Sequence, residues 1–410
     1  MKYIVVLGDG MADHPMDELN GRTPLDAANK PNMDFIAGNG HCGMVKTVPD
    51  GMPPGSDVAN LAVMGYDPAI YSTGRASIEA VSMGIELFDG DLCYRCNLVT
   101  LSEASAYEDS VMIDYSAGEI STDEAKALVE ALVKEFDIEL HAGISYRHSL
   151  VLRKATGGAL HTPPHDISGK PISKYLPSGH NAEFFTSLMK RSREILQNHP
   201  VNLERVNRGQ RPANSMWFWG EGTRPSLPPF AAKYGMNGSV ISAVDLVKGI
   251  GISAGFQSVN VIGATGTLHT NYEGKAAAAL DALKTRDFVY LHIEAPDECA
   301  HHGDVKCKIL AIEYIDKRII GPVMEELNRR GEDYSIMVLP DHATPVELKT
   351  HTGEPVPFAY YRHTKSTRAD KPASVERFTE KEAATTGVYI SEGYTLLDEF
   401  LQAKGLARLA

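Results

Sequence analysis

The chain has 410 residues, which is more than one compact core usually holds, so we expect two domains. Its formal net charge of −13 argues against nucleic acid or an anionic membrane as a partner, and no run of Lys and Arg reverses this sign locally. The apolar run at residues 3–7 is too short for a signal peptide, and no stretch approaches the ~20 apolar residues that cross a bilayer, so we expect a cytoplasmic location.

Short β-branched runs alternate with helical patterns along the chain. The first strand spans residues 3–7, and a helix begins after Ser121, which has the spacing of a capping box with Glu124. Later patterns predict, in order, a helix near 274–284, a strand at 288–293, a helix at 305–330 and a strand at 335–339. This alternation indicates an α/β fold with a mostly parallel sheet.

The stretch between residues 88 and 205 differs from its surroundings. It contains polar, turn-rich segments such as residues 162–171, together with the helix that begins after Ser121. We therefore expect a smaller α/β domain at 88–205, inserted into a core formed by residues 1–87 and 206–410.

A carboxylate follows each of the three predicted core strands. These carboxylates are Asp9, Asp297 and Asp341. The Gly-rich turn around Asp9, taken alone, is ordinary turn chemistry. Because the carboxyl ends of parallel strands meet at one edge of a sheet, however, the three side chains can converge there.

Histidines accompany two of these carboxylates. Asp297 and His301 are four residues apart and would share one face of a helical turn, whereas His342 directly follows Asp341 and His351 lies nine residues further on. Each group alone could be a solvated turn. Together, the carboxylates and imidazoles suit zinc or manganese, and two such ions can clamp a phosphoryl group in transfer.

Ser56 lies where the Pro/Gly turn at residues 53–55 meets an apolar-periodic helix. The simplest interpretation is a helix N-cap, which local physics alone favours. The same position would also suit a nucleophile, because a phosphoserine there would face the positive end of the helix. A nearby metal ion could lower the pKa of the hydroxyl.

Ten short motifs run in order through nearly the whole chain. They are GDGM at 8–11, GSDVAN at 55–60, STGRA at 72–76, RCNLVT at 95–100, DYSAG at 114–118, VISAVD at 240–245, GATG at 263–266, NYEGK at 271–275, EAPDE at 294–298 and LPDH at 339–342. This series resembles the cofactor-independent phosphoglycerate mutases, specifically their shorter archaeal-type branch. The resemblance implies an alkaline-phosphatase-like core with an inserted substrate-closing domain.

The resemblance also implies roles for the matching positions. One metal ion would be held by Asp9, Ser56, Asp341 and His342, and the other by Asp297, His301 and His351. Manganese is the implied metal, with zinc or magnesium as alternatives. In the implied reaction Ser56 takes the phosphoryl group from 3-phosphoglycerate, and the 2-hydroxyl of the trapped glycerate then accepts it, without 2,3-bisphosphoglycerate.

The inserted domain would have to supply cations for this small phosphorylated substrate, a proton carrier and protection from water. Arginine suits the first task because its planar fork pairs with carboxylate and phosphate. The candidate cations are Arg75, Arg95, Arg147, Arg205, Arg208 and Arg211. The candidate acid/base groups are His148 and, preferred because they adjoin in a Pro/Gly-rich loop, His165 and Asp166.

Several other features receive no role. The five cysteines are too sparse to indicate a disulfide framework, and Cys93 and Cys96 are expected to be buried thiols. Residues 217–219 (WFW) are expected in a strand of the core and at its flank. Among the unassigned histidines, which are His161, His269, His292 and His302, we expect His302 to lie nearest the metals.

Other functions stay open at this point. A related phosphotransferase, such as the proposed homoserine kinases of this branch, would share Ser56 and its metals. A phosphatase or a phosphopentomutase on the same core matches the motifs less well. A non-enzymatic metal-binding protein is disfavoured by the complete ligand set.

Overall fold

The structure is a computed structural model that describes residues 1–364 and 375–401. The chain divides into two compact units: unit 1 comprises residues up to 72 and from 226 onward, and unit 2 comprises residues 73–225. None of the helices in the described ranges has the length and apolar character needed to span a bilayer.

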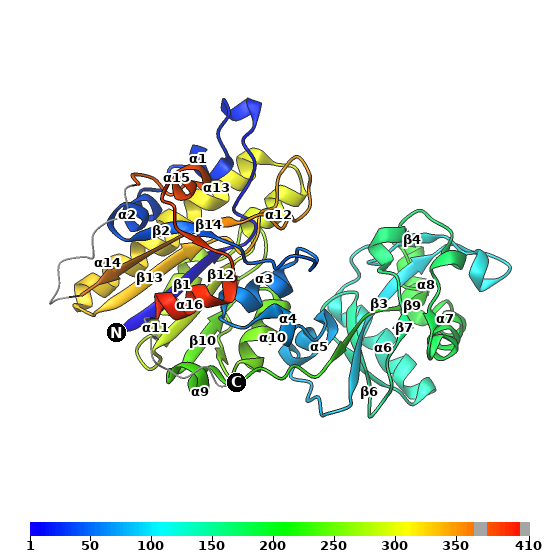
Figure 1. The fold of residues 1–410 in the computed structure, drawn as a ribbon. Helices are drawn as coiled ribbons and strands as arrows, with labels where there is room; N and C mark the ends of the chain where they lie inside the picture. Colours follow the sequence, from blue (N-terminus) through cyan, green and yellow to red (C-terminus); the bar gives the residue numbers. More distant parts are fainter. Residues whose placement is uncertain (365–374, 402–410) are drawn as a thin grey trace. The chain divides into compact units, whose positions relative to one another are not determined.

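Unit 1 is built on an eight-stranded sheet with the order β11, β10, β12, β1, β13, β14, β2, β15 (Figure 1). The strands are β1 (Lys2–Gly8), β2 (His41–Val45), β10 (Gly238–Ile241), β11 (Gln257–Ser258), β12 (Phe288–Ile293), β13 (Tyr334–Leu339), β14 (Val356–His363) and β15 (Tyr389–Ile390). Among these described strands only β14 runs antiparallel to its neighbours. The predicted α/β class with a mostly parallel sheet is confirmed.

The three strands predicted from their apolar runs lie side by side at the centre of this sheet. β1 pairs in parallel with β12 on one side and with β13 on the other, and Leu7 lies opposite both His292 and Leu339. The strands therefore end at the same level. The residues that follow them start from one edge of the sheet.

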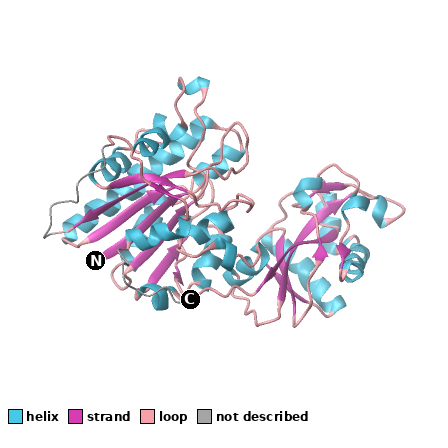
Figure 2. Cartoon of the chain, viewed as in Figure 1, coloured by secondary structure: helices cyan, strands magenta, loops and turns pink. Residues whose placement is uncertain are grey.

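Helices cover both faces of the sheet (Figure 2). Apolar side chains of α2, α11, α13 and α14 join Ile4 and Val6 of β1 in one core, and Figure 1 shows α3, α10 and α16 in front of the sheet. The helix predicted at 305–330 is confirmed, since a π-helical turn at Asp316–Ile320 joins α13 to α14. The helices of unit 1 are α1 (Pro24–Ala27), α2 (Pro31–Asn39), α3 (Ser56–Val63), α4 (Pro68–Tyr71), α9 (Phe230–Tyr234), α10 (Asp245–Ser253), α11 (Tyr272–Ala282), α12 (Ala295–His301), α13 (Val305–Ile315), α14 (Gly321–Arg330), α15 (Glu380–Thr385) and α16 (Leu396–Phe400).

Unit 2 contains a five-stranded antiparallel sheet. Its strands are β3 (Leu92–Leu101), β4 (Met112–Asp114), β5 (Glu139–Ala142), β6 (Arg147–Leu152) and β9 (Ser215–Thr223), and β7 (Ala159–Leu160) pairs separately with β8 (Ser178–Gly179). The helices are α5 (Arg75–Ser82), α6 (Thr122–Phe136), α7 (Ala182–Leu196) and α8 (Pro200–Asn207). Ser121 caps α6 by accepting the N–H of Glu124, as the sequence predicted.

The limits of unit 2 differ from the predicted limits of 88 and 205. β9, which the sequence assigned to the core, pairs with β3, and α5 packs against both strands. The chain therefore enters unit 2 at Thr73 and leaves it at Pro225. The prediction failed at these ends because an antiparallel partner from far along the chain completes the sheet.

One disulfide is present, between Cys299 of α12 and Cys307 of α13. The sparse cysteines gave no indication of it, because only the packing of α12 against α13 brings the two sulfur atoms together. Cys42, Cys93 and Cys96 are buried thiols, which for Cys93 and Cys96 was the expectation.

Candidate active site

Every side chain named as a metal ligand lies at the carboxyl edge of the unit 1 sheet. The loops after β1 and β13 supply Asp9, Asp341, His342 and His351, α12 supplies Asp297 and His301, and the start of α3 supplies Ser56. Isolated bridges from Ala343 to Met11 and Ala12 join the two loops, and another to Thr352 closes the loop after β13. Strand order therefore gathers residues that are hundreds of positions apart in the sequence.

Asp297, His301 and His351 form one cluster. His301 Nε2 lies 3.1 Å from Asp297 Oδ2 and 3.0 Å from His351 Nε2, and His351 Nε2 lies 3.4 Å from Asp297 Oδ1. His301 Nδ1 lies 2.9 Å from the carbonyl oxygen of Lys349, which can only accept, so Nδ1 carries a hydrogen and Nε2 is the nitrogen that faces the cluster. Two imidazoles and a carboxylate so arranged can hold a metal ion.

His342 is the centre of a second, adjoining cluster. Its Nε2 lies 3.2 Å from Ser56 Oγ, 3.5 Å from Asp9 Oδ1 and 3.4 Å from Asp341 Oδ2. The rings of His342 and His351 stack with centroids 4.0 Å apart, so the two clusters adjoin. We call the side chains of both clusters together the cage. The members of the second cluster are buried.

Ser56 is the first residue of α3 and not its N-cap. Gly55 occupies the cap position in extended backbone, and the Ser56 hydroxyl faces His342 instead of the free N–H groups of its own helix. The N-cap interpretation of Ser56 is therefore wrong. The buried hydroxyl points into the cage.

Neighbouring groups hold the carboxylates in place. Asp341 accepts hydrogen bonds from the N–H of Gly10 at 3.1 Å and from Asn60 Nδ2 at 2.8 Å, and the Thr344 hydroxyl donates to Asp297 Oδ1 at 2.5 Å. Gly10 has a φ of 58°, and a Cβ there would lie 2.5 Å from Asp297 Oδ1. The turn after β1 therefore requires glycine.

The cage crowds negative charge into a buried space. Burial, and then the charge of Asp341, raises the pKa of Asp9 well above its usual range. Burial also acts to raise the pKa of Asp297, but hydrogen bonds led by that of His301 hold it well below its usual range. Asp9 Oδ1 is buried without a hydrogen-bond partner. A divalent cation would satisfy that oxygen and offset the like charges, so the residues present fit a metal site.

In unit 2, three of the six candidate arginines belong to one cationic cluster. The Arg95 guanidinium lies 3.9 Å from the ring centroid of Trp219, and its Nε lies 2.9 Å from Glu79 Oε2. Arg75 also reaches Glu79, at 3.3 Å. Burial lowers the pKa of Arg95 to about 10, with Glu79 opposing the shift and Arg75 and Arg147 adding to it.

His165 adjoins this cluster. Its ring meets the edge of Trp219 with centroids 5.2 Å apart, and its Nε2 lies 3.7 Å from Asp166 Oδ1. Trp219 is half-buried at the margin of the unit 2 core and donates its Nε1–H to Asn97 Oδ1 at 2.9 Å. The Trp219 ring therefore contacts and supports Arg95 and His165, in addition to packing against the apolar core of unit 2.

The remaining candidates in unit 2 are already engaged. Carboxylates bind the arginines at 2.6–2.8 Å: Arg205 and Arg208 pair with Glu124, and Arg211 pairs with Asp114. His148 is buried in β6, where its Nδ1 accepts the N–H of Gly143. These contacts stabilise unit 2 itself.

The relatives of the chain share one description. Residues 37–202 match the sequence model of 2,3-bisphosphoglycerate-independent phosphoglycerate mutase. An enzyme of that name from Methanosarcina barkeri is 49% identical over 98% of this chain and 100% of its own length. The chain belongs to the 2,3-bisphosphoglycerate-independent phosphoglycerate mutase family. A probable mutase from Geobacter sulfurreducens is 48% identical over 98% of this chain and 100% of its own.

Two solved structures also resemble this mutase-family chain. A protein from Pyrococcus horikoshii has a TM-score of 0.81 and 31% identity, covering 100% of this chain and 98% of its own. A cofactor-independent phosphoglycerate mutase from Thermoplasma acidophilum has a TM-score of 0.65 and 27% identity, covering 99% and 100%. The family that the motifs predicted is confirmed.

One histidine beside the candidate ligands was not predicted from the sequence. His302, expected nearest the metals, has a side chain that is 71% exposed and lies 3.8 Å from Glu298. His292 instead is fully buried on β12, with Nε2 2.8 Å from Asp9 Oδ2. The available signal was a histidine inside an otherwise apolar strand that leads into Asp297.

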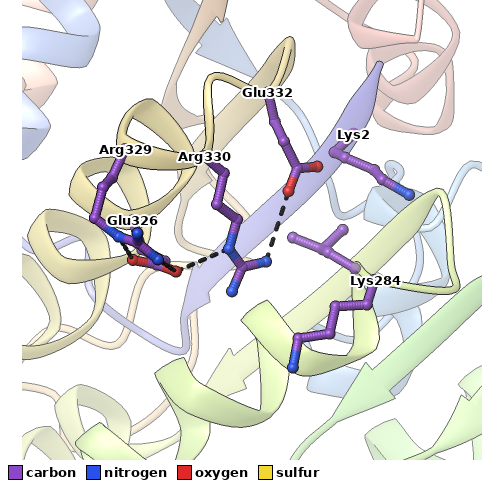
Figure 3. A pocket seen from close by; sticks show the side chains of 7 residues that line it. Lys2, Lys284, Glu326, Arg329, Arg330 and Glu332 are labelled. Carbon is purple, nitrogen blue, oxygen red and sulfur yellow. Dashed lines mark hydrogen bonds and ion pairs between the residues drawn. The ribbon is translucent and has the colours of Figure 1, made fainter.

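Unit 1 has a hollow at the opposite edge of its sheet, beside Lys2 at the start of β1 (Figure 3). Arg329 and Arg330 both pair there with Glu326, and Arg330 also lies near Glu332. Since carboxylates already neutralise these arginines, and β1 separates the hollow from Asp9, it is not part of the candidate active site.

Proposed function

We propose that this chain interconverts 3-phosphoglycerate and 2-phosphoglycerate without 2,3-bisphosphoglycerate, through a phosphoserine at Ser56. The position of Ser56 carries the proposal, because its buried hydroxyl lies 3.2 Å from His342 Nε2 in a cage of carboxylates and imidazoles. Family membership supports the choice of substrates. We expect the enzyme to act in the cytoplasm, where glycolysis and gluconeogenesis use this reaction.

The cage would hold two divalent metal ions. Asp297, His301 and His351 would bind one ion, and Asp9, Ser56, Asp341 and His342 would bind the other. We propose manganese, with zinc or magnesium as alternatives, because the ligands are oxygen and imidazole nitrogen. When bound, such ions neutralise phosphoryl oxygens and lower the pKa of a serine hydroxyl.

The reaction would consist of two in-line transfers. Ser56 Oγ attacks the phosphorus of 3-phosphoglycerate, the bond from phosphorus to the 3-oxygen breaks, and glycerate stays bound. The glycerate 2-hydroxyl then attacks the phosphoserine, and the Ser56 oxygen leaves.

Unit 2 would bind glycerate and exclude water. Arg75, Arg95 and Arg147 suit the substrate carboxylate and phosphate, because their three positive charges exceed the single carboxylate of Glu79, which Arg75 and Arg95 share. Arg208 and Arg211 are weaker candidates, since Glu124 and Asp114 already hold them. His165, with Asp166, would carry the proton between the two glycerate oxygens.

The alcohol that accepts the phosphoryl group must be tested directly. A homoserine kinase built on the same core would share Ser56 and the metal ligands. Purified manganese-loaded protein should convert 3-phosphoglycerate to 2-phosphoglycerate without 2,3-bisphosphoglycerate. Homoserine with candidate phosphoryl donors, assayed in parallel, should give no product. Strict dependence on the bisphosphate, or turnover with homoserine alone, would contradict the proposal.

A further inference from the structure

We propose that His292 positions Asp9 for metal binding, by holding one oxygen of its carboxylate and leaving the other oxygen for the ion. The inference rests on the ligand role given to Asp9 in the proposed function. It assigns to His292 a task that the sequence motifs did not suggest.

The His292 ring is held on several sides inside the sheet. The residue lies on β12 opposite Leu7 of β1 and is fully buried. Its Nε2 lies 2.8 Å from Asp9 Oδ2 and its Nδ1 lies 3.0 Å from Ser242 Oγ. Lys275 Nζ donates a hydrogen bond to the His292 backbone carbonyl at 3.1 Å. The ring has little freedom to turn away from Asp9.

Both neighbours of the ring are compatible with one tautomer. A carboxylate can only accept, so the hydrogen must lie on Nε2. Ser242 Oγ accepts the N–H of Val244 at 2.9 Å, which leaves the serine hydroxyl hydrogen for Nδ1. Nε2–H therefore donates to the ionised Asp9, and Nδ1 can accept the hydroxyl hydrogen of Ser242.

In this arrangement the two oxygens of the Asp9 carboxylate have different surroundings. Oδ2 accepts from His292, whereas Oδ1 is buried without a hydrogen-bond partner and lies 3.5 Å from His342 Nε2. Oδ1 thus faces the other ligands of its cluster. Groups that hydrogen-bond to ligating side chains orient them, and their loss typically weakens metal binding about 10- to 100-fold.

A competing arrangement makes His292 a ligand in its own right, since Asp9, His292 and Glu294 lie close enough to hold an ion. In that case Nε2 would offer its lone pair and could not donate to Asp9. Glutamine separates the two cases, because its amide can present an N–H near the position of Nε2–H but offers no imidazole lone pair.

The test measures the affinity and stoichiometry of Mn²⁺ for the metal-free chain, by competition with a chelating dye. His292→Ala should weaken binding about 10- to 100-fold, and His292→Gln should stay within about threefold of the unmodified chain. In an Asp9→Ala background, His292→Ala should have no further effect, because it acts through Asp9. Circular dichroism and thermal melting show whether the variants fold.

Ser242→Ala provides a second variant if His292→Ala does not fold, and it should weaken Mn²⁺ binding only while Asp9 is present. Unchanged affinity in His292→Ala, with a loss in Asp9→Ala, overturns the positioning role and leaves the proposed function intact. Unchanged affinity in Asp9→Ala removes Asp9 from the ligand set and contradicts the proposed function itself. Equal losses in the glutamine and alanine variants, or fewer ions bound without His292, make His292 a ligand and overturn the inference.

Discussion

At the residue scale, hydrogen bonds decide which atom of each ligand faces the cage. His301 uses Nδ1 on the Lys349 carbonyl and keeps Nε2 for the cluster. Asn60 donates to Asp341 Oδ2, and Thr344 donates to Asp297 Oδ1. The side chains are therefore oriented before any ion binds, which lowers the entropy lost on binding.

The metal-free protein should lose stability as the pH rises from about 6.5 to about 9. The hydrogen bond to Asp297 raises the pKa of His301 to about 9, so the protonated ring stabilises the folded state. That stabilisation is fully present below the pKa that His301 has in the unfolded chain. It is lost as the pH rises through the pKa that His301 has in the folded chain. Manganese should reverse the trend, because it binds neutral imidazole.

Melting temperatures of metal-free and manganese-loaded protein across this pH range test the prediction. His301→Gln is the matched control and should show a smaller metal-free trend. If the variant and the unmodified chain lose stability in parallel, His301 is not the responsible group.

Gly10→Ala should lower the free energy of unfolding by about 1–3 kcal/mol and weaken manganese binding. A Cβ at this position of positive φ would lie 2.5 Å from both Asp297 Oδ1 and Thr344 Oγ1. Gly21→Ala is the control, because Gly21 also has positive φ but has nothing within 4 Å of an added Cβ. Denaturant unfolding and dye competition should separate the two variants. Equal manganese affinities would argue against crowding at Asp297.

At the element scale, the sequence predicted the strands that carry the site but not every partner of those strands. The apolar runs of β1, β12 and β13 were visible, and their common edge followed from parallel pairing. The position of Ser56 as first helical residue depends on the backbone of Gly55, which no residue pattern specifies. The apolar strand around His292 indicated its burial, but its contact with Asp9 depends on strand order. The pairing of β9 with β3 spans more than a hundred residues and was out of reach.

The pairing of β9 with β3 leads to a prediction for Trp219, which β9 places over Arg95. A cation–π contact of this kind contributes about 0.5–2 kcal/mol, so Trp219→Leu should raise the KM for 3-phosphoglycerate about 2- to 30-fold. Trp219→Phe keeps an aromatic face and should have a smaller effect. Steady-state kinetics with a check of the fold decide between these outcomes, and equal KM values for both variants would exclude the supporting role of the ring.

At the scale of the whole molecule, the fate of the phosphoryl group should depend on unit 2. A phosphoserine beside two metal ions is open to any hydroxyl held in line, and water is present at about 55 M. Arg147→Ala should therefore slow 2-phosphoglycerate formation and raise the fraction released as phosphate, because glycerate is held less firmly. Disturbing the loop of His165 and Asp166 should act in the same direction.

Both products can be followed in one reaction. Arg208→Ala is the control for Arg147→Ala, because Glu124 already holds the Arg208 guanidinium. The ratio of released phosphate to 2-phosphoglycerate should change less in Arg208→Ala than in Arg147→Ala. If the partition between phosphate and 2-phosphoglycerate is unchanged in Arg147→Ala, the cationic cluster does not hold glycerate. The chemistry proposed for Ser56 would be unaffected by that result.

The most direct measurement of the central claim compares Ser56→Ala with the unmodified chain, both loaded with manganese and free of 2,3-bisphosphoglycerate. The variant should fold, keep binding manganese through the Asp297 cluster, and form 2-phosphoglycerate slower by about 10³-fold or more. The unmodified chain should also carry a phosphoryl group on Ser56 when trapped during turnover. Retention of about a tenth or more of the activity by Ser56→Ala would contradict the phosphoserine route.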